Sequence, residues 1–225
     1  MGTKHTTYFN LLDALKEQGC SVCFIIRKNA QKYMDDFLYE SVNDPGLRKE
    51  IKESAGFCSR HAWQIQKFGD GFGLGIIYEC LMQLVLEKLR AIDGSAASIK
   101  AILKQLDKDE KAKNSCIFCK EEKDVEGRYI AIFLENFDDP EIKFAYKNSS
   151  GLCLFHLNLA VKKCKNKEFA AEMINIEAAK FGSLIAEVKE FHRKHDHRFS
   201  KEKIGKEGDS WIRAIEKMIG KEGVF

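Results

Sequence analysis

Six of the eight cysteines in the chain and two of its six histidines are confined to four short segments. GCSVC at 19–23 and SCIFC at 115–119 contain Cys-x-x-Cys, whereas GFCSRH at 56–61 and GLCLFH at 151–156 contain Cys-x-x-His. Residues three apart at a turn or at the start of a helix project to the same side, so each pattern can direct two ligands at one metal ion. The four segments therefore point to metal coordination as a constraint on the fold.

The four segments belong to a longer internal repeat, in which residues 20–61 align with 116–156 after a one-residue deletion. The only two prolines of the chain fall on matching positions. We predict a tandem duplication with a period near 95 residues. The matched pairs are Cys20/Cys116, Cys23/Cys119, Tyr33/Tyr129, Phe37/Phe133, Leu38/Leu134, Asp44/Asp139, Pro45/Pro140, Gly56/Gly151, Cys58/Cys153 and His61/His156.

Each copy has the signals of a helical hairpin. After the first Cys-x-x-Cys, apolar residues recur at helical spacing through 24–42. Asp44 then suits a helix N-cap and Pro45 the first helical position, which predicts a return helix that ends near Gly56. The second copy repeats this order of signals. Its stretch LCLFHLNL at 152–159 alternates like a strand, but the match to the first copy predicts a helix start there.

A long apolar helix is predicted at the end of each copy. The first covers 76–92, is apolar on most faces and is expected to be central in the fold. The second runs from about 168 to 194. Its predicted inward residues are Phe169, Met173, Ile176, Leu184, Val188 and Phe191.

Two further helices are predicted outside the hairpins. A linker at 93–98 is followed by a short amphipathic helix. After a polar gap, a last helix begins at Asp209-Ser210 and is expected to bury Trp211, Ile215 and Met218 and to end at Gly220. The predicted fold class is therefore all-α, a duplicated metal-clipped helical hairpin followed by a long apolar helix, packed as one helical body.

Within each copy the ligands add up to three sulfurs and one nitrogen, a tetrahedral set typical of structural zinc. We expect each metal ion to close the open end of its own hairpin, so that the chain returns to its start across the 34 residues between Cys23 and Cys58. The prediction is two Zn²⁺ ions per chain. The predicted ligands are Cys20, Cys23, Cys58 and His61 in the first copy and Cys116, Cys119, Cys153 and His156 in the second.

Other chemistries remain open for these residues. An iron–sulfur cluster can use the same ligands, although histidine in place of one cysteine is the minority arrangement. A dithiol redox pair at each Cys-x-x-Cys is disfavoured because no βαβ pattern surrounds either motif. A catalytic zinc would need an open coordination position, and four protein ligands close it, which argues against a metal-dependent hydrolase.

Composition and charge limit the class of protein and the compartment that we expect. Hydrophobic residues make up 44% and charged residues 32% of the chain, as in ordinary globular proteins. The net charge of +3 gives no support to nucleic-acid binding. No run of apolar residues is long enough for a membrane span. The first residues indicate a helix and not a signal peptide, so we expect a cytoplasmic protein with reduced thiols.

Some conspicuous residues fall outside the four segments. Cys80 and Cys164 have no counterpart in the other copy, and core packing is the simplest interpretation. The glycine-rich GDGFGLG at 69–75 lacks the spacing of a phosphate-binding loop and is interpreted as a loop leading into a helix. His192, His195 and His197 could form a further metal site, but a polar helix end is favoured.

The first copy resembles an uncharacterised prokaryotic family known only as a domain of unknown function. The resemblance rests on Cys-x-x-Cys, then Asn-Asp-Pro, then Gly-Phe-Cys-x-x-His-Ala-Trp, followed by Asp-Gly-Phe-Gly at 70–73 and Ile-Ile-Tyr-Glu at 76–79. The second copy keeps the cysteines and the histidine but lacks the Ala-Trp and the glycine loop. The resemblance implies no activity.

The sequence thus predicts three regions, a Cys3His helical repeat at 1–95, a second at 96–198, and a C-terminal amphipathic helix at 199–225. No catalytic arrangement is recognised, so we expect a non-enzymatic metal-binding protein that acts as a binding or adaptor protein for an unidentified protein partner. The alternative is an iron–sulfur protein for electron transfer or redox sensing.

Overall fold

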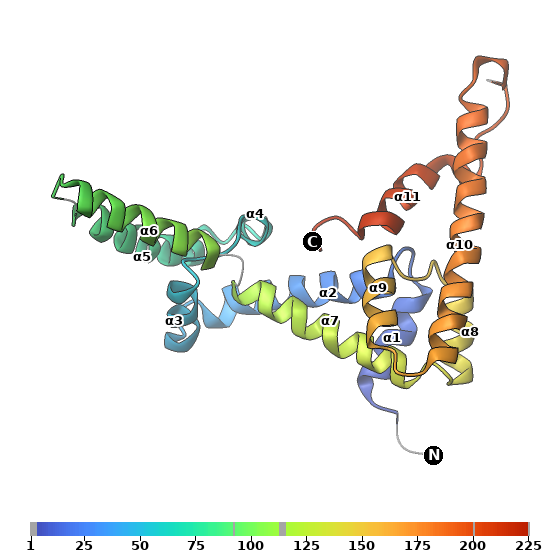
Figure 1. Ribbon diagram of the computed structural model, residues 1–225, viewed down its shortest axis with the longest axis horizontal. Coiled ribbons are helices and arrows are strands. Elements are labelled where there is room, and N and C mark those ends of the chain that lie inside the picture. The colour runs from blue at the N-terminus through green and yellow to red at the C-terminus, as the bar shows by residue number, and fades with distance from the viewer. Residues whose placement is uncertain (1–3, 92, 113–115, 200, 225) are drawn as a thin grey trace. The chain divides into compact units, whose positions relative to one another are not determined.

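The computed structural model describes residues 4–91, 93–112, 116–199 and 201–224. Across these residues the regular structure is helical and contains no strand (Figure 1), so the predicted all-α class is confirmed. No helix in the described ranges is both long enough and apolar enough to cross a membrane. The α-helices are α1 (Thr6–Lys16), α2 (Ser21–Asp36), α3 (Pro45–Glu53), α4 (Ser59–Gln66), α5 (Gly71–Arg90), α6 (Ala96–Ala112), α7 (Ile117–Glu135), α8 (Pro140–Asn148), α9 (Leu154–Lys163), α10 (Lys167–Lys194) and α11 (Ser210–Ile219). Shorter helical segments are the π-helix η1 (Phe37–Ser41) and the 3₁₀ turns η3 (His197–Phe199) and η4 (Lys206–Asp209).

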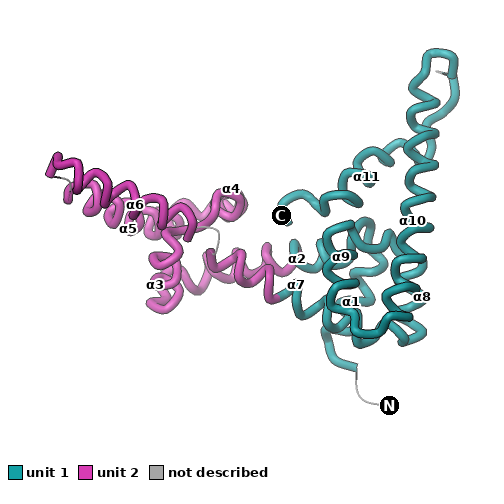
Figure 2. The backbone as a smooth tube through the Cα atoms, viewed as in Figure 1, with its two compact units in different colours: residues 1–27, 125–225 teal, residues 28–124 magenta. Residues whose placement is uncertain are grey.

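The chain divides into two compact units (Figure 2). Unit 1 contains residues 1–27 and 125–225, and unit 2 contains residues 28–124. Both boundaries fall inside helices, so that α2 begins in unit 1 and ends in unit 2, whereas α7 begins in unit 2 and ends in unit 1. The units therefore group the residues differently from the predicted repeats 1–95 and 96–198, which stay a prediction about the sequence.

The helix starts follow the local signals. Asp44 caps α3 by accepting a hydrogen bond from the Leu47 N–H at 2.7 Å, with Pro45 at the first position. Asp139 and Pro140 start α8 in the same way. The segment 152–159 contains the first residues of α9 and is not a strand, as the match between the copies predicts.

Two predictions about burial are wrong. In α5 only Gly73 and Ile77 are buried, because the first half of the helix packs on the unit 2 core and the second half extends beyond it. Met82 is 64% exposed, so this helix is not central. In α11 the helix bounds are as predicted, but Trp211 and Ile215 are 48% and 50% exposed.

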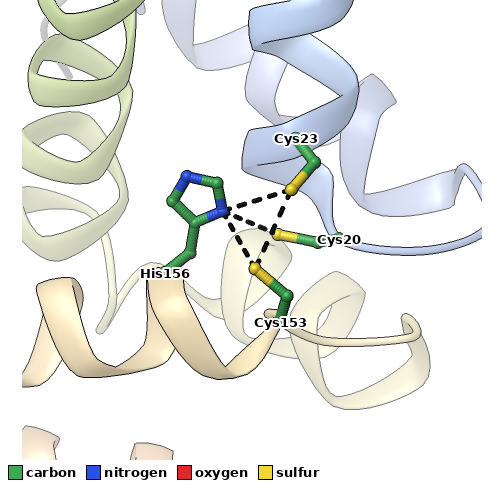
Figure 3. A group of neighbouring side chains, drawn as sticks. All are labelled: Cys20, Cys23, Cys153 and His156. Atoms are coloured by element: carbon green, nitrogen blue, oxygen red, sulfur yellow. Dashed lines mark hydrogen bonds between the residues drawn. The ribbon is translucent and has the colours of Figure 1, made fainter. Parts of the chain in front are cut away.

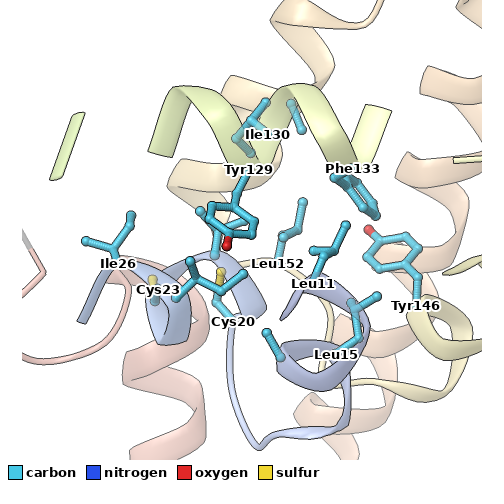
Figure 4. Packing of buried hydrophobic residues seen from close by; sticks show 14 of the residues in the cluster. Leu11, Leu15, Cys20, Cys23, Ile26, Tyr129, Ile130, Phe133, Tyr146 and Leu152 are labelled. Atoms are coloured by element: carbon cyan, nitrogen blue, oxygen red, sulfur yellow. The ribbon is translucent and has the colours of Figure 1, made fainter. Parts of the chain in front are cut away.

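The core of unit 1 joins α1 and the start of α2 to α7, α8 and α9 (Figure 4). Leu11 and Leu15 of α1 pack with Phe133 of α7 and Tyr146 of α8, and the cysteines of α2 belong to the same buried cluster. Unit 2 has its own core, in which aromatic rings of η1, of the segment before α4 and of α7 meet edge to face. Each core thus lies against one pair of the Cys-x-x-Cys and Cys-x-x-His segments.

Candidate metal centres

The first candidate centre, which we call site 1, lies in unit 1 and consists of Cys20, Cys23, Cys153 and His156 (Figure 3). The His156 Nδ1 atom is 3.3 Å from the Sγ atoms of Cys20 and Cys23 and 3.2 Å from that of Cys153. The Cys23 and Cys153 sulfurs are 3.8 Å apart. All four residues are buried.

The second candidate centre, site 2, lies in unit 2 and consists of Cys58, His61, Cys116 and Cys119. The His61 Nδ1 atom is 3.2–3.4 Å from the three sulfurs. The Cys116–Cys119 and Cys119–Cys58 sulfur distances are 3.4 Å and 3.7 Å. His61 and Cys116 are fully buried, whereas Cys58 and Cys119 are partly exposed.

The grouping corrects the prediction that each copy forms its own site. The Cys-x-x-Cys of the first copy lies with the Cys-x-x-His of the second, and the converse holds at site 2. The return helix is too short to bring the chain back to the start of α2, as the predicted metal-clipped hairpin requires. The nine residues of α3 cover about 13 Å, whereas the 21 residues of α2 and η1 cover about 30 Å at the rise of an α-helix. The metal-clipped hairpin is therefore wrong, although its eight ligands are the residues that converge.

The same local structure presents the ligands at both sites. Cys58 and Cys153 are the N-cap residues of α4 and α9, with nearly equal backbone angles, so the histidine three residues later lies in the first helical turn. Two residues before each of these cysteines, Gly56 and Gly151 adopt positive φ angles of 101° and 81°. Glycine tolerates this conformation without strain, which explains the glycine in both Cys-x-x-His segments.

The residues between the ligands fix their orientation. Val22 is fully buried between Cys20 and Cys23, and Phe118 is 1% exposed between the cysteines of site 2. The Phe118 ring packs on the imidazole of His61 at a centroid distance of 5.6 Å. Since these apolar side chains are held in the core, the sulfurs next to them have little freedom to turn away.

A carboxylate lies behind each histidine, and the sequence analysis missed both. Glu126 Oε1 is 3.0 Å from His156 Nε2, and Glu122 Oε1 is 3.1 Å from His61 Nε2. At site 1 the contact is a hydrogen bond, so a tautomer with its proton on Nε2 leaves the Nδ1 lone pair directed at the sulfurs, an arrangement typical of metal-bound histidine. At site 2 the carboxylate is within ion-pair distance, but the His61 Nε2 atom makes no hydrogen bond among the described residues. Glu122 also pairs with Arg60 through two contacts of 3.0 Å and 2.5 Å.

The crowding of acidic groups shifts their pKa values. Burial disfavours the imidazolium of His61, but the Cys116 sulfur and the neighbouring carboxylate raise its pKa to about 9. The hydrogen bond between Cys116 and Cys119 lowers the pKa of Cys116 to about 3 and raises that of Cys119. The pKa values shift in the same directions at site 1, where the pKa of Cys153 is lowered and that of His156 is raised to about 11. A divalent cation would relieve this competition for protons, because it can pair with all three sulfurs at once.

The distances fit a single tetrahedral ion. Bonds of about 2.3 Å to sulfur and about 2.0–2.1 Å to nitrogen place the sulfurs of a tetrahedral zinc site about 3.8 Å apart and sulfur about 3.6 Å from nitrogen. The sulfur–sulfur distances of 3.4–3.8 Å lie within a few tenths of an ångström of these values. The four ligand atoms of each site lie within 4.8 Å of one another.

The remaining candidates do not join these sites. Cys80 and Cys164 are partly exposed and lie outside both groups. His192, His195 and His197 form no metal-ligand group among the described residues, and His195 stacks on Phe191. The glycine-rich segment leads into α5, as predicted, with Asp70 as the capping residue.

These features define a helical protein with two Cys3His groups, each of which combines ligands from both halves of the chain. The chain matches the model of a family described as a family of unknown function (DUF6062) over residues 4–223, and it belongs to that family. This match confirms the resemblance to an uncharacterised domain family. The chain is also similar to the "Uncharacterized 23.9 kDa protein in xynA 3'region" of Caldicellulosiruptor sp. (strain Rt8B.4). The identity is 29% over 189 residues, which are 84% of this chain and 88% of the relative. No solved structure matches the chain.

Proposed function

We propose that the protein binds two zinc ions, one at each Cys3His site, and that both ions are structural. The observation that carries the proposal is the convergence of eight ligand atoms into two compact groups of four. Three thiolates and one imidazole are the ligand set that soft to borderline divalent ions such as zinc prefer. The carboxylates of Glu122 and Glu126 supply the outer contacts that orient the histidines.

A structural role fits better than a catalytic one. Four protein ligands complete a tetrahedral shell and leave no position for water or substrate. The ligands of site 1 are all buried, with exposed fractions of 6% for Cys20 and 0% for the other three. Binding at such sites contributes directly to the free energy of folding.

Zinc is favoured over an iron–sulfur cluster by the size of the ligand groups. A cluster distributes its protein ligands over different iron atoms, so its ligand atoms spread more widely than those around one ion. A span of at most 4.8 Å between ligand atoms suits a single ion. The iron–sulfur alternative predicts a coloured protein with visible absorption, which makes the two proposals easy to separate.

The role that we propose for the zinc-stabilised protein is non-enzymatic binding of a protein partner in the reducing cytoplasm. Exposed apolar side chains in the second half of α5 support this role, because apolar patches of this kind often mark interaction surfaces. Val85, Leu86 and Leu89 are 40%, 44% and 45% exposed. They line a groove of about 990 Å³ that also reaches Cys58 of site 2.

Elemental analysis of protein purified without metal-affinity resin and with oxygen excluded tests the proposal. We expect two zinc ions per chain for the wild-type protein. The matched control Cys80→Ser removes a cysteine outside both groups and should also retain two. Detection of iron together with acid-labile sulfide would refute the zinc proposal and support the iron–sulfur alternative. A folded protein without metal would refute metal binding.

A further inference from the structure

Unit 1 also contains a cavity of about 490 Å³ that α10 and α11 border. Gly19 and Cys20, together with Ser149, Ser150 and Cys153, line it where the chain approaches site 1. A volume of this size lies in the range of small-molecule binding sites. The feature that distinguishes this cavity from a packing defect is its charge.

Four cationic side chains line the cavity, but only two carboxylates do, Glu187 and Glu216. Three of the four cations have acidic partners. Arg213 pairs with Glu187 at 2.5 Å, and the other two pair with glutamates that are not among the lining residues. The cations are Lys147, Lys180, Arg213 and Lys217.

Lys180 is the exception. Its Nζ atom donates to the backbone carbonyl oxygens of Tyr146, at 2.6 Å, and of Ser149, and it approaches the Ser149 hydroxyl at 3.4 Å. These oxygens are neutral, and within the described part of the chain no carboxylate forms an ion pair with this ammonium group. This partly buried cation beside the cavity therefore forms no direct ion pair among the described residues, although the charge of Glu177 lies near it.

Lys217 adds to the positive charge beside the cavity. Lys217 is 8% exposed and pairs at 2.5 Å with the buried carboxylate of Glu177. That carboxylate also accepts hydrogen bonds from the Tyr146 hydroxyl and the Leu152 N–H, so its oxygens are already used. Burial lowers the pKa of Lys180 to about 8; the negative charge of Glu177 offsets part of this effect, and the positive charge of Lys217 adds to it. An anion in the cavity would offset the effects of burial and of Lys217.

Part of the cavity lining is apolar. Ile176, Ala179 and Leu184 of α10 line the cavity on the same helix as Lys180. We propose that this cavity binds a small organic anion, whose carboxylate or phosphate group contacts Lys180 and whose apolar body packs on these three residues. The proposal goes beyond the metal sites and does not depend on which metal they hold.

Titrations of isotope-labelled full-length protein, followed by NMR, test the proposal with four probes. Phenyl phosphate and benzoate carry an anionic group on an apolar ring, benzamide is the neutral counterpart of benzoate, and inorganic phosphate lacks the ring. We expect the two aromatic anions to bind with dissociation constants in about the millimolar range, as befits ligands of this size. The backbone amides of Gly19, Ser150 and Ser183 should shift.

Three variants assign the binding to the cavity. Lys180→Met should weaken binding of the preferred aromatic anion at least tenfold, whereas Lys189→Met, an exposed lysine of the same helix, should leave it unchanged. Ser183→Phe fills the cavity from an exposed position without removing a hydrogen bond of Lys180, so it should block binding even if Lys180→Met fails to fold. Zinc content and helicity are measured for each variant.

Several results would overturn the proposal. Equal binding of benzamide would show that charge plays no part, and equal binding of inorganic phosphate would show that the apolar part of the lining plays none. Unchanged affinity in Lys180→Met would exclude the lysine. Absence of binding together with loss of zinc in Lys180→Met would show that the cations only balance the negative charge of site 1. Because zinc content is read separately, loss of the metal proposal and loss of the anion proposal are distinguishable.

Discussion

The exchange of ligands between the two halves of the chain can be tested by counting metal ions in double variants. Cys23→Ser and Cys153→Ser both remove a ligand of site 1, so the double variant should still hold one ion, at site 2. Cys23→Ser combined with Cys58→Ser removes one ligand from each site and should hold none. If each copy instead bound its own metal, these two results would be reversed.

The expected loss of stability follows from the lengths of chain that the sites connect. Site 1 joins Cys23 to Cys153, 130 residues away, and site 2 joins Cys58 to Cys119, 61 residues away. Loop closure over these lengths corresponds to about 5 and about 4 kcal/mol in the relation used for cross-links. Loss of either site should therefore lower Tm by roughly 8–20 °C in a chain of this size.

The measurement combines metal content after dialysis against a chelator with thermal unfolding followed by circular dichroism. The dialysis removes ions held weakly by an incomplete set of ligands. The two substitutions at site 1 should be strongly non-additive in Tm, because the first already abolishes the clip, whereas substitutions at different sites should be close to additive. Two ions in either double variant, or additive losses for Cys23→Ser and Cys153→Ser, would refute the structural assignment.

Two further predictions concern residues around the sites. Gly151→Ala should destabilise the protein by several kcal/mol, because a Cβ atom there would lie 2.7 Å or less from both Glu177 carboxylate oxygens. Gly69→Ala has the same φ of 81° with nothing within 4 Å, so it should cost only the backbone strain of about 1–2 kcal/mol, and similar denaturant midpoints for the two variants would contradict the reasoning. Glu126→Gln should weaken zinc binding at site 1 about 10–100-fold in chelator competition and leave site 2 unchanged, while Asp124→Asn on the exposed side of α7 should have no effect. Equal loss at both sites in Glu126→Gln would remove its assigned role.

The features that the sequence predicted well are those that neighbouring residues determine. The capping of α3 by Asp44 needs only an oxygen acceptor next to a proline, and both are visible in the sequence. The eight ligands were predicted for a similar reason, because Cys-x-x-Cys and Cys-x-x-His each place two ligands within one turn. Gly220 ends α11 at a positive φ of 89°, again as a single residue dictates.

The features that were missed depend on packing between distant segments. The apolar residues of α11 predict the helix, but the residues of this helix that the structure buries are Ser210 and Lys217. Lys217 is held in this position by the carboxylate of Glu177, a partner 40 residues away that no local pattern reveals. Similarly, α7 carries several acidic residues after its cysteines, and the sequence does not show that Glu122 and Glu126 are the two that face histidines.

The pairing of the Cys-x-x-Cys and Cys-x-x-His segments is the clearest feature that the sequence could not predict. Pairing within a copy and pairing between copies both give three sulfurs and one nitrogen. What decides between them is the path of two helices. α2 starts at site 1 and ends in unit 2, and α7 starts at site 2 and ends in unit 1. Each Cys-x-x-Cys therefore begins a helix whose far end belongs to the core of the other unit. A hydrophobic core and a metal site of one unit thus both require residues from each half of the chain. In this arrangement each predicted copy gives its Cys-x-x-Cys to one site and its Cys-x-x-His to the other, so a chain with one copy would need a second molecule to form a site with the same pairing.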